Sequence, residues 1–261
     1  MPPNATGWQR TPRIASPDRR RQQITALPTG GSATPRVQGL TNLDKSTQPI
    51  LNQKGARMSP CQSLSVGTIG AGTVAQAIAG HAVAAGHQVI LSNSRGPESL
   101  AELVDRLGAN ASAGTVAEAA QADLVILAVG WDQVPEAVQG LSDWNGRILI
   151  DATNQWHHGP GTEVDLGDQT GSERNAALMP GARVVKAFNT IYGSVTAQNP
   201  RRTDGRLVVF LAGDDEDAKA KVSAFIDSMG FAPVDIGGLR DGRLMQVGGG
   251  PLVGLHVVKL A

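Results

Sequence analysis

Cysteine, aromatic residues and net charge are scarce in this sequence of 261 residues, and each scarcity excludes a class of function. Cys61 is the only cysteine, so no disulfide can form within the chain, and we expect a protein of the reducing cytoplasm. Aromatic residues make up 3% of the chain, too few for the stacking surfaces that bind single-stranded nucleic acid. The formal net charge is zero, so no overall field attracts nucleic acid or an anionic membrane. We expect neither partner.

Long apolar runs are also missing. No run approaches the roughly 18 residues that span a bilayer. The first residues carry Arg and Ser without the apolar stretch of a secretory signal, which leaves an organelle transit peptide as the alternative for this end. Cys61 stands just before the first predicted strand without a partner motif, and we interpret it as an ordinary thiol rather than a catalytic one.

Residues 1–60 differ in composition from the rest of the chain. They are rich in Pro, Gln, Thr, Arg and Gly and show no period of 2 or 3.6, so they cannot bury enough apolar surface to offset their ordering entropy. We predict a disordered segment over 1–60 and one folded domain over 61–261. The cluster of Arg19, Arg20 and Arg21 could contact phosphate, although a solvated tail is the favoured interpretation. Met58 is an alternative start, which would make residues 1–57 an upstream extension.

From Leu64 onward, strand and helix patterns alternate. Continuous apolar strands between amphipathic helices are typical of a parallel sheet that is covered on both faces. Gly86 is expected to end the first helix, and Pro97 suits the first turn of the second. We predict a Rossmann-like, doubly wound α/β domain with a mostly parallel sheet and a small C-terminal strand–helix–strand extension. The predicted strands lie at 64–69, 88–92, 109–112, 123–129, 147–151, 182–191, 206–213 and 232–236; the helices lie at 73–85, 97–107 and 115–121, after Trp131, at 214–229 and in a final stretch.

The first strand leads into a glycine-rich turn, G-x-G-x-x-A, at Gly70, Gly72 and Ala75. In a dinucleotide site the first glycine permits the tight turn, the second lets the pyrophosphate approach the backbone, and the small third residue allows close packing of helix on strand. The N-terminus of the following helix directs unpaired N–H groups and a partial positive charge at the phosphates. We therefore predict a dinucleotide site. The alternative is a structural turn without a ligand.

The end of the second strand indicates which dinucleotide binds. NAD sites usually carry Asp or Glu there to bind the ribose 2′-hydroxyl, but this chain has Asn93, Ser94 and Arg95, and no carboxylate before Glu98. Ser94 and Arg95 can donate hydrogen bonds to a 2′-phosphate, each contributing roughly 1.5–3 kcal/mol. We predict NADPH as the cofactor. The alternative is a polar loop that caps a helix.

Several segments together resemble the family of NADP oxidoreductases that depend on the deazaflavin coenzyme F420. The likeness is carried by SVGTIGAGTVAQAIAG, GHQVILSNSR, DLVILAVGW and ILIDATN, by the most distinctive segment, MPGARVVKAFNTI, and by RLVVFLAGDDEDAKAKVSAFIDSMGFAPVDIGGL. It covers nearly all of residues 64–261 and none of 1–57. The glycine-rich turn is shared with other families, including pyrroline-5-carboxylate reductases, whose helical dimerisation domain has no evident counterpart after Ile191.

The resemblance implies a cofactor site along the loops that follow the strands. The pyrophosphate would contact the loop after the first strand, and the 2′-phosphate would contact the loop after the second. The cofactor would then run along the loop after the fourth strand, and its nicotinamide would lie near the loops after the fifth and sixth. The implied residues are Gly70, Ala71, Gly72, Thr73 and Val74 at the pyrophosphate, and Ser94 and Arg95 at the 2′-phosphate. They are Ala128, Val129 and Trp131 along the cofactor, and Thr153, Asn154, Phe188 and Asn189 near the nicotinamide. Asn154 and Asn189 could equally cap turns, and Trp131 could simply pack at a helix start.

These features predict hydride transfer between NADPH and a small-molecule acceptor, which the resemblance suggests is a deazaflavin. The two cofactors would supply the chemistry while the protein aligns their rings, which fits the lack of a catalytic triad, of paired carboxylates and of a Tyr-x-x-x-Lys pair. No catalytic residue is assigned. The alternatives are reduction of an imine, flavin or ferric chelate, and a non-catalytic NADP sensor.

Two further segments carry weaker predictions. His157 and His158 are adjacent in a loop, so in a strand they would face opposite sides, and without a third ligand we predict no metal site. The loop is interpreted as exposed, or else as a lid over the substrate. A helical apolar surface around 241–260 could form a homodimer contact or belong to the core; its residues are Leu244, Val247, Leu252, Leu255 and Val258.

Overall fold

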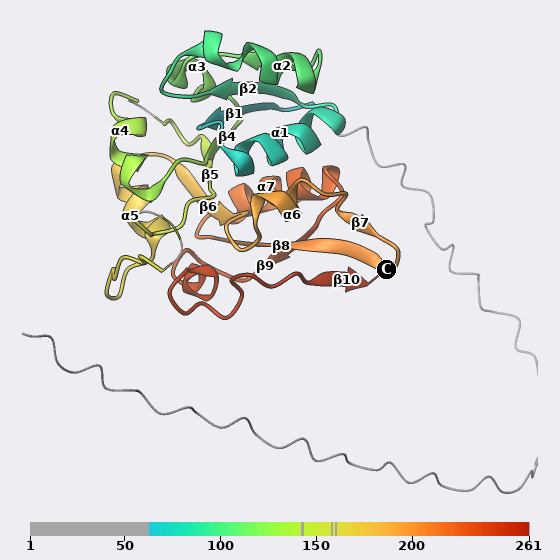
Figure 1. The fold of residues 1–261 in the computed structure, drawn as a ribbon. Helices are drawn as coiled ribbons and strands as arrows, with labels where there is room; N and C mark the ends of the chain where they lie inside the picture. Colours follow the sequence, from blue (N-terminus) through green and yellow to red (C-terminus); the bar gives the residue numbers. More distant parts are fainter. Residues whose placement is uncertain (1–62, 142–143, 158, 160, 261) are drawn as a thin grey trace, which may run out of the picture. The chain divides into compact units, whose positions relative to one another are not determined.

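The computed structural model describes residues 63–141, 144–157, 159 and 161–260, and Figure 1 shows how their elements are arranged. The predictions for residues 1–60, Met58, Cys61 and His158 lie outside the described residues. No helix in the described part is both long and apolar enough to cross a bilayer.

The described residues form one ten-stranded sheet. Its main path runs β10-β8-β6-β5-β4-β1-β2-β3, and β7 and β9 pair with β8. The neighbours from β6 to β3 are all parallel, whereas β8 runs antiparallel to β6. The strands are β1 (Ser65–Ile69), β2 (Gln88–Ser92), β3 (Ala111–Ala113), β4 (Leu124–Leu127), β5 (Ile148–Asp151), β6 (Arg183–Ala187), β7 (Arg201–Arg202), β8 (Gly205–Gly213), β9 (Ala232–Asp235) and β10 (Val258–Leu260). The predicted Rossmann-like, mostly parallel sheet is confirmed.

Helices cover both faces of this sheet. The α-helices are α1 (Thr73–Ala84), α2 (Ala101–Leu107), α3 (Val116–Ala119), α4 (Val134–Val138), α5 (Gly171–Leu178), α6 (Gly193–Thr196) and α7 (Glu216–Ser228), and the 3-10 helices are η1 (Pro97–Leu100), η2 (Trp131–Gln133) and η3 (Asp241–Met245). Figure 1 shows α1 beside α6, with α4 and α5 apart from them.

The strands are apolar on both faces because each face packs against helices. In β4, Leu124 and Ile126 join a core cluster that includes α1, α2 and α7, whereas Val125 and Leu127 join a second cluster with α4 and α5. All four side chains are at most 1% exposed. Burying each contributes roughly 1.5–3 kcal/mol, so the continuous apolar run is the sequence signature of a strand between two layers.

Individual glycines explain close contacts and helix ends. Gly67 lies in the middle of β1, where a Cβ would come within 1.8 Å of the Ala119 carbonyl oxygen, so only glycine lets α3 lie directly on the strand. Gly86 follows α1 with φ of +89° and donates its N–H to Val83, which confirms the predicted helix end.

The C-terminal prediction was wrong in one respect. Residues 241–260 form η3, a series of turns and β10 rather than an apolar helix. Gly248 and Gly249 adopt φ values of +84° and +136°, which a helix cannot contain. Val247 is buried and Leu252 packs against the cluster around Val208, whereas Leu244 and Leu255 are exposed.

Candidate functional site

The loops that follow β2, β1, β4, β5 and β6 form a row at the carboxyl edge of the sheet. Backbone hydrogen bonds join neighbouring ends: Gly70 donates to Ser92, Ala128 to Ile69, and Ala152 to Leu127, at 3.1, 2.9 and 3.0 Å. Ligands of open α/β sheets bind beyond this edge. An extended ligand bound along this row would cross the loops from Ser94 towards Asn189.

A cavity of about 890 Å³ opens at this edge, within the range of roughly 300–1,000 Å³ typical of small-molecule sites. It brings together seven of the predicted residues, which are Gly70, Ala71, Gly72, Ser94, Arg95, Ala128 and Val129. Gly130, which lies within the predicted turn from Ala128 to Trp131, also lines the cavity. The predictions did not include its other lining residues, which are Ile69, Asn93, Thr115, Val116, Ala117, Gln133, Glu136, Ala137, Gln139, Gly140 and Leu141. Most of these belong to α3, α4 and their flanking loops, which follow β3 and β4 and could have been found by extending the carboxyl-edge rule to every strand.

The two glycines of the first turn have different environments. Gly70 has φ of +103°, and a Cβ there would lie 2.4 Å from the Ala128 carbonyl oxygen. Gly72 has ordinary extended angles, φ −77° and ψ −175°, and a Cβ there would meet no protein atom within 4 Å. The fold thus requires glycine at Gly70, whereas at Gly72 the absence of a side chain keeps space open towards the cavity.

Helix α1 begins at this open space. Gly72 is its N-cap, no side chain among the described residues caps it, and its first turn carries no acid. Its first N–H groups and the positive end of its dipole are therefore available to an anion. The turn fits a pyrophosphate.

The loop after β2 is held in place by its own side chains. The Arg95 N–H donates to Asn93 Oδ1 at 2.9 Å, Asn93 Nδ2 donates to Ser99 Oγ at 2.9 Å, and the Ser99 hydroxyl donates to the Gly96 carbonyl at 2.7 Å. Ser94 and Arg95 are exposed, and within the described ranges the Arg95 guanidinium takes part in no ion pair. Its donors are available to an anionic group, which fits a 2′-phosphate.

Two asparagines join the ends of β5 and β6. Asn154 Nδ2 donates to the Asn189 carbonyl and Asn189 Nδ2 donates to Asn154 Oδ1, both at 3.1 Å. Asn189 Nδ2 also donates to the Met245 carbonyl at 2.7 Å. The Asn189 side chain is buried, and its Oδ1 has no hydrogen-bond partner among the described residues. The Asn154–Asn189 amide pair therefore contains one acceptor, Asn189 Oδ1, that no described residue satisfies, at the β6 end of the row of loops.

A buried polar network lies directly beneath Asn154. Asp151 Oδ1 accepts from the Thr153 N–H and hydroxyl at 2.9 and 2.7 Å, and Oδ2 accepts from Ser172 at 2.6 Å. Lys186 Nζ lies 3.7 Å from Asp151 Oδ2 and donates to the Thr153 carbonyl at 3.1 Å. Burial raises the pKa of the Asp151 carboxyl, but Lys186 and these hydrogen bonds outweigh it, so the pKa lies below its ordinary value. Sequence reasoning missed this network, although a lysine and an aspartate within apolar strands are its signal.

Seven predicted residues lie outside the cavity lining, namely Thr73, Val74 and Trp131, and Thr153, Asn154, Phe188 and Asn189 after β5 and β6. Thr73 and Val74 begin α1, and Thr73 packs so closely on Gly193 that a Cβ there would lie 2.8 Å from its Cγ2. Trp131 begins η2 and lies against Gly171, where a Cβ would be 3.2 Å from its ring. Asn154 belongs to the amide pair.

The loop after Trp156 is tied to the start of η2. His157 Nδ1 lies 2.8 Å from Asp132 Oδ1, and both side chains are about half exposed. No group of three or more His, Cys, Asp or Glu within the described ranges could hold a metal ion.

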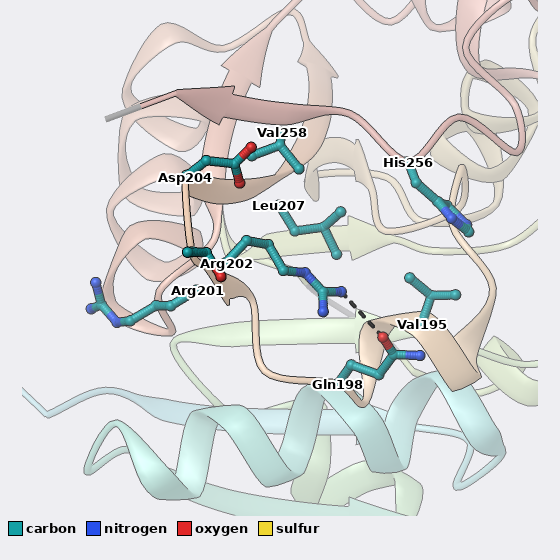
Figure 2. Close-up of a pocket in the computed structure, with 9 residues that line it drawn as sticks. Val195, Gln198, Arg201, Arg202, Asp204, Leu207, His256 and Val258 are labelled. Atoms are coloured by element: carbon teal, nitrogen blue, oxygen red, sulfur yellow. Dashed lines mark hydrogen bonds between the residues drawn. The ribbon is translucent and has the colours of Figure 1, made fainter.

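A second cavity, of about 600 Å³, lies between α6, the β7–β8 turn and β10. Figure 2 shows the Arg202 guanidinium donating to Gln198 there, with His256 on the opposite side. None of the predicted site residues lines it.

Comparison with known proteins found one family model and several solved structures that are similar to this chain. The model of "NADP oxidoreductase coenzyme F420-dependent" proteins matches residues 65–155. The hypothetical protein SMa0349 from Sinorhizobium meliloti is 42% identical, with a TM-score of 0.71 over 76% of this chain and 96% of that one. A candidate F420-dependent NADP reductase from Arthrobacter sp. FB24 is 26% identical, with a TM-score of 0.61 over 69% and 88%.

A curated relative is much longer than this chain. Metalloreductase STEAP3 from Rattus norvegicus is 33% identical over 189 residues, which are 72% of this chain but only 36% of STEAP3. Residues 65–155 thus match the family of NADP oxidoreductases described as coenzyme F420-dependent, and the similarity to the solved relatives extends over most of the chain.

Proposed function

We propose that this protein transfers a hydride between NADP(H) and a second acceptor, and that the acceptor is a deazaflavin such as coenzyme F420. The observation that carries the cofactor assignment is that one cavity contains both the open space at Gly72 and Arg95, whose guanidinium forms no ion pair with the described residues. The family model and the Arthrobacter relative support the acceptor.

In this proposal the adenine half of the cofactor binds in the cavity. The N–H groups at the start of α1 hold the pyrophosphate while Ser94 and Arg95 bind the 2′-phosphate. A carboxylate would repel that phosphate, and the nearest lining acid, Glu136, stands on α4 rather than on the β2 loop. The arrangement favours NADPH over NADH by about a hundredfold or more, if two charged hydrogen bonds contribute roughly 1.5–3 kcal/mol each.

The nicotinamide half would extend past Ala128 and Val129 towards the amide pair. Bound nicotinamide supplies the hydride, and the protein's task is alignment and exclusion of water. Asn154, which is half-buried and held by its hydrogen bonds to Asn189, would orient the carboxamide. The C-terminal segment would shield this end, because Asn189 donates to Met245, Gln155 Nε2 to Val247 at 3.0 Å, and the Gly254 N–H to Thr190 at 2.8 Å.

Anaerobic mixing of the protein with NADPH and oxidised deazaflavin tests the acceptor. We expect the deazaflavin absorbance to fall at a rate that depends on protein concentration. Mixing with NADH is the matched control and should give a much slower change. No loss of absorbance at any pH would contradict the proposal.

A second candidate function is reduction of a ferric chelate. It is favoured by the 33% identity to metalloreductase STEAP3, although this chain spans only about a third of that protein. NADPH oxidation with ferric citrate and no deazaflavin separates the two functions. Turnover with the chelate alone would support the second candidate.

A further inference from the structure

Lys186 and Asp151 form a charged pair inside the core of the sheet. They are register partners on the parallel strands β6 and β5, with side chains 1% and 0% exposed. Removing two charges from water costs several kcal/mol each, and replacing such a pair with apolar residues is often neutral or stabilising. Stability alone therefore gives no reason for this pair in strands that are otherwise apolar.

The pair instead immobilises one residue, Thr153. The Thr153 N–H and hydroxyl both bind Asp151, and its carbonyl accepts from Lys186 at 3.1 Å. Helix α5 reinforces this contact, because Asn175 Nδ2 donates to Asp151 Oδ2 at 3.2 Å and to Thr153 Oγ1 at 3.1 Å. Every polar group of Thr153 is thus held by a buried partner.

Thr153 directly precedes Asn154, so the network sets the direction in which the chain leaves β5. The partner residue Asn189 is positioned by its own backbone, since Phe188 before it is buried and adopts φ of +65°, a conformation rare for a bulky side chain. Two neighbouring strand ends are therefore constrained independently, and the two constraints meet at the Asn154–Asn189 hydrogen bonds.

We propose that Lys186 and Asp151 are positioning residues that hold the Asn154–Asn189 pair in the geometry that binds the nicotinamide end of NADP(H). The inference rests on the proposed function. Neither residue lines the cavity assigned to the adenosine and pyrophosphate. Their influence is therefore confined to the nicotinamide, and they act through Thr153 and Asn154 rather than on the cofactor.

A pair of ligands separates this role from a structural one. NADP⁺ contains the nicotinamide, whereas 2′-phospho-ADP-ribose keeps the pyrophosphate and the 2′-phosphate but lacks the nicotinamide ring. The double variant Lys186→Met/Asp151→Asn removes both charges together, which avoids leaving one buried and unpaired. Calorimetry should show NADP⁺ binding weakened about tenfold, as expected when one or two hydrogen bonds are lost, with the fragment bound within about twofold of the wild-type protein.

Lys219→Met is the matched control. Lys219 is also nearly buried and has two carboxylate partners, Glu216 at 2.9 Å and Asp235 at 3.0 Å, but it lies on α7 and contacts none of this network. Its loss should leave the ratio of the two affinities unchanged. If the double variant does not fold, Thr153→Val removes the hydroxyl's hydrogen bonds to Asp151 and Asn175 while keeping both charges, and it should weaken NADP⁺ binding selectively by about threefold.

The outcomes are distinguishable. Equal weakening of both ligands, or unchanged NADP⁺ binding by a folded double variant and by Thr153→Val, would overturn the inference while leaving the proposed function intact. Failure of the wild-type protein to bind either ligand would overturn the proposed function and this inference with it.

Discussion

Replacing Gly72 with alanine should remove NADPH binding without unfolding the protein. The backbone at Gly72 already has φ of −77° and ψ of −175°, which alanine adopts without strain, and its Cβ would meet no protein atom within 4 Å. Alanine reduces the number of unfolded conformations, which stabilises the variant by about 0.4–1 kcal/mol, and the poorer N-cap opposes this by roughly 0.5–1 kcal/mol. The free energy of unfolding should therefore change by less than about 1 kcal/mol.

The effect on binding is expected to be large because the new methyl group occupies the space assigned to the pyrophosphate. Each hydrogen bond to a charged group that is lost weakens binding by roughly 1.5–3 kcal/mol, or about 10- to 150-fold. Calorimetric titration with NADPH and thermal unfolding of the same samples measure the two effects separately.

Gly70→Ala is the contrasting variant. A Cβ at Gly70 would lie 2.4 Å from the Ala128 carbonyl oxygen at φ of +103°, so this substitution should destabilise the fold by about 3 kcal/mol or more. A Gly72→Ala protein that binds NADPH as tightly as the wild type would refute the assignment of the turn at Gly72 to the pyrophosphate. So would a Gly72→Ala protein as unstable as Gly70→Ala.

Two further predictions concern stability. His87 is 2% exposed, accepts the Leu64 N–H at Nδ1 and contacts Ser228 through Nε2, and burial lowers its pKa. As the pH falls below about 6.5, His87 takes up a proton in the unfolded state before it does in the folded state, so its contribution to stability is complete above that pH and is lost below it at up to about 1.4 kcal/mol per pH unit. Urea unfolding at pH 7.5 and 5.5 should show this loss in the wild type and a smaller loss in His87→Gln. Equal losses in the two proteins would contradict the reasoning. Gly67→Ala should destabilise the folded protein by more than about 3 kcal/mol, because its Cβ would lie 1.8 Å from the Ala119 carbonyl oxygen. An unfolding temperature within a few degrees of the wild type would show that α3 does not lie against β1 as described.

The sequence predicted the parts of the fold that follow from local pattern. The apolar run at Leu124–Leu127 marks a strand covered on both faces, and Gly86 marks the end of α1, because each depends on residues adjacent in the chain. The C-terminal segment was predicted less well. Its apolar residues occur at helical spacing, but the left-handed backbone at Gly248 and Gly249 prevents a helix.

The residues of the candidate site also divide into those that a local motif predicts and those that only the folded sheet brings together. Gly72 and Arg95 were predicted from a local motif, and both line the cavity. The opposite wall at Thr115 and Gln139 comes from helices whose packing depends on the whole sheet. The contact of Lys186 with Asp151 requires the register of two strands 35 positions apart, which no local pattern contains.

The affinities for NADPH and NADH, measured in the wild-type protein and in Arg95→Ala, test the central claim most directly. Arg202→Ala is the matched control, since it removes an arginine from the other cavity. We predict that the wild type and the control prefer NADPH by about a hundredfold, and that Arg95→Ala weakens NADPH binding by about 10- to 150-fold while NADH binding stays within about twofold. Equal wild-type affinities for the two cofactors, or NADPH binding unaffected by Arg95→Ala, would contradict the account.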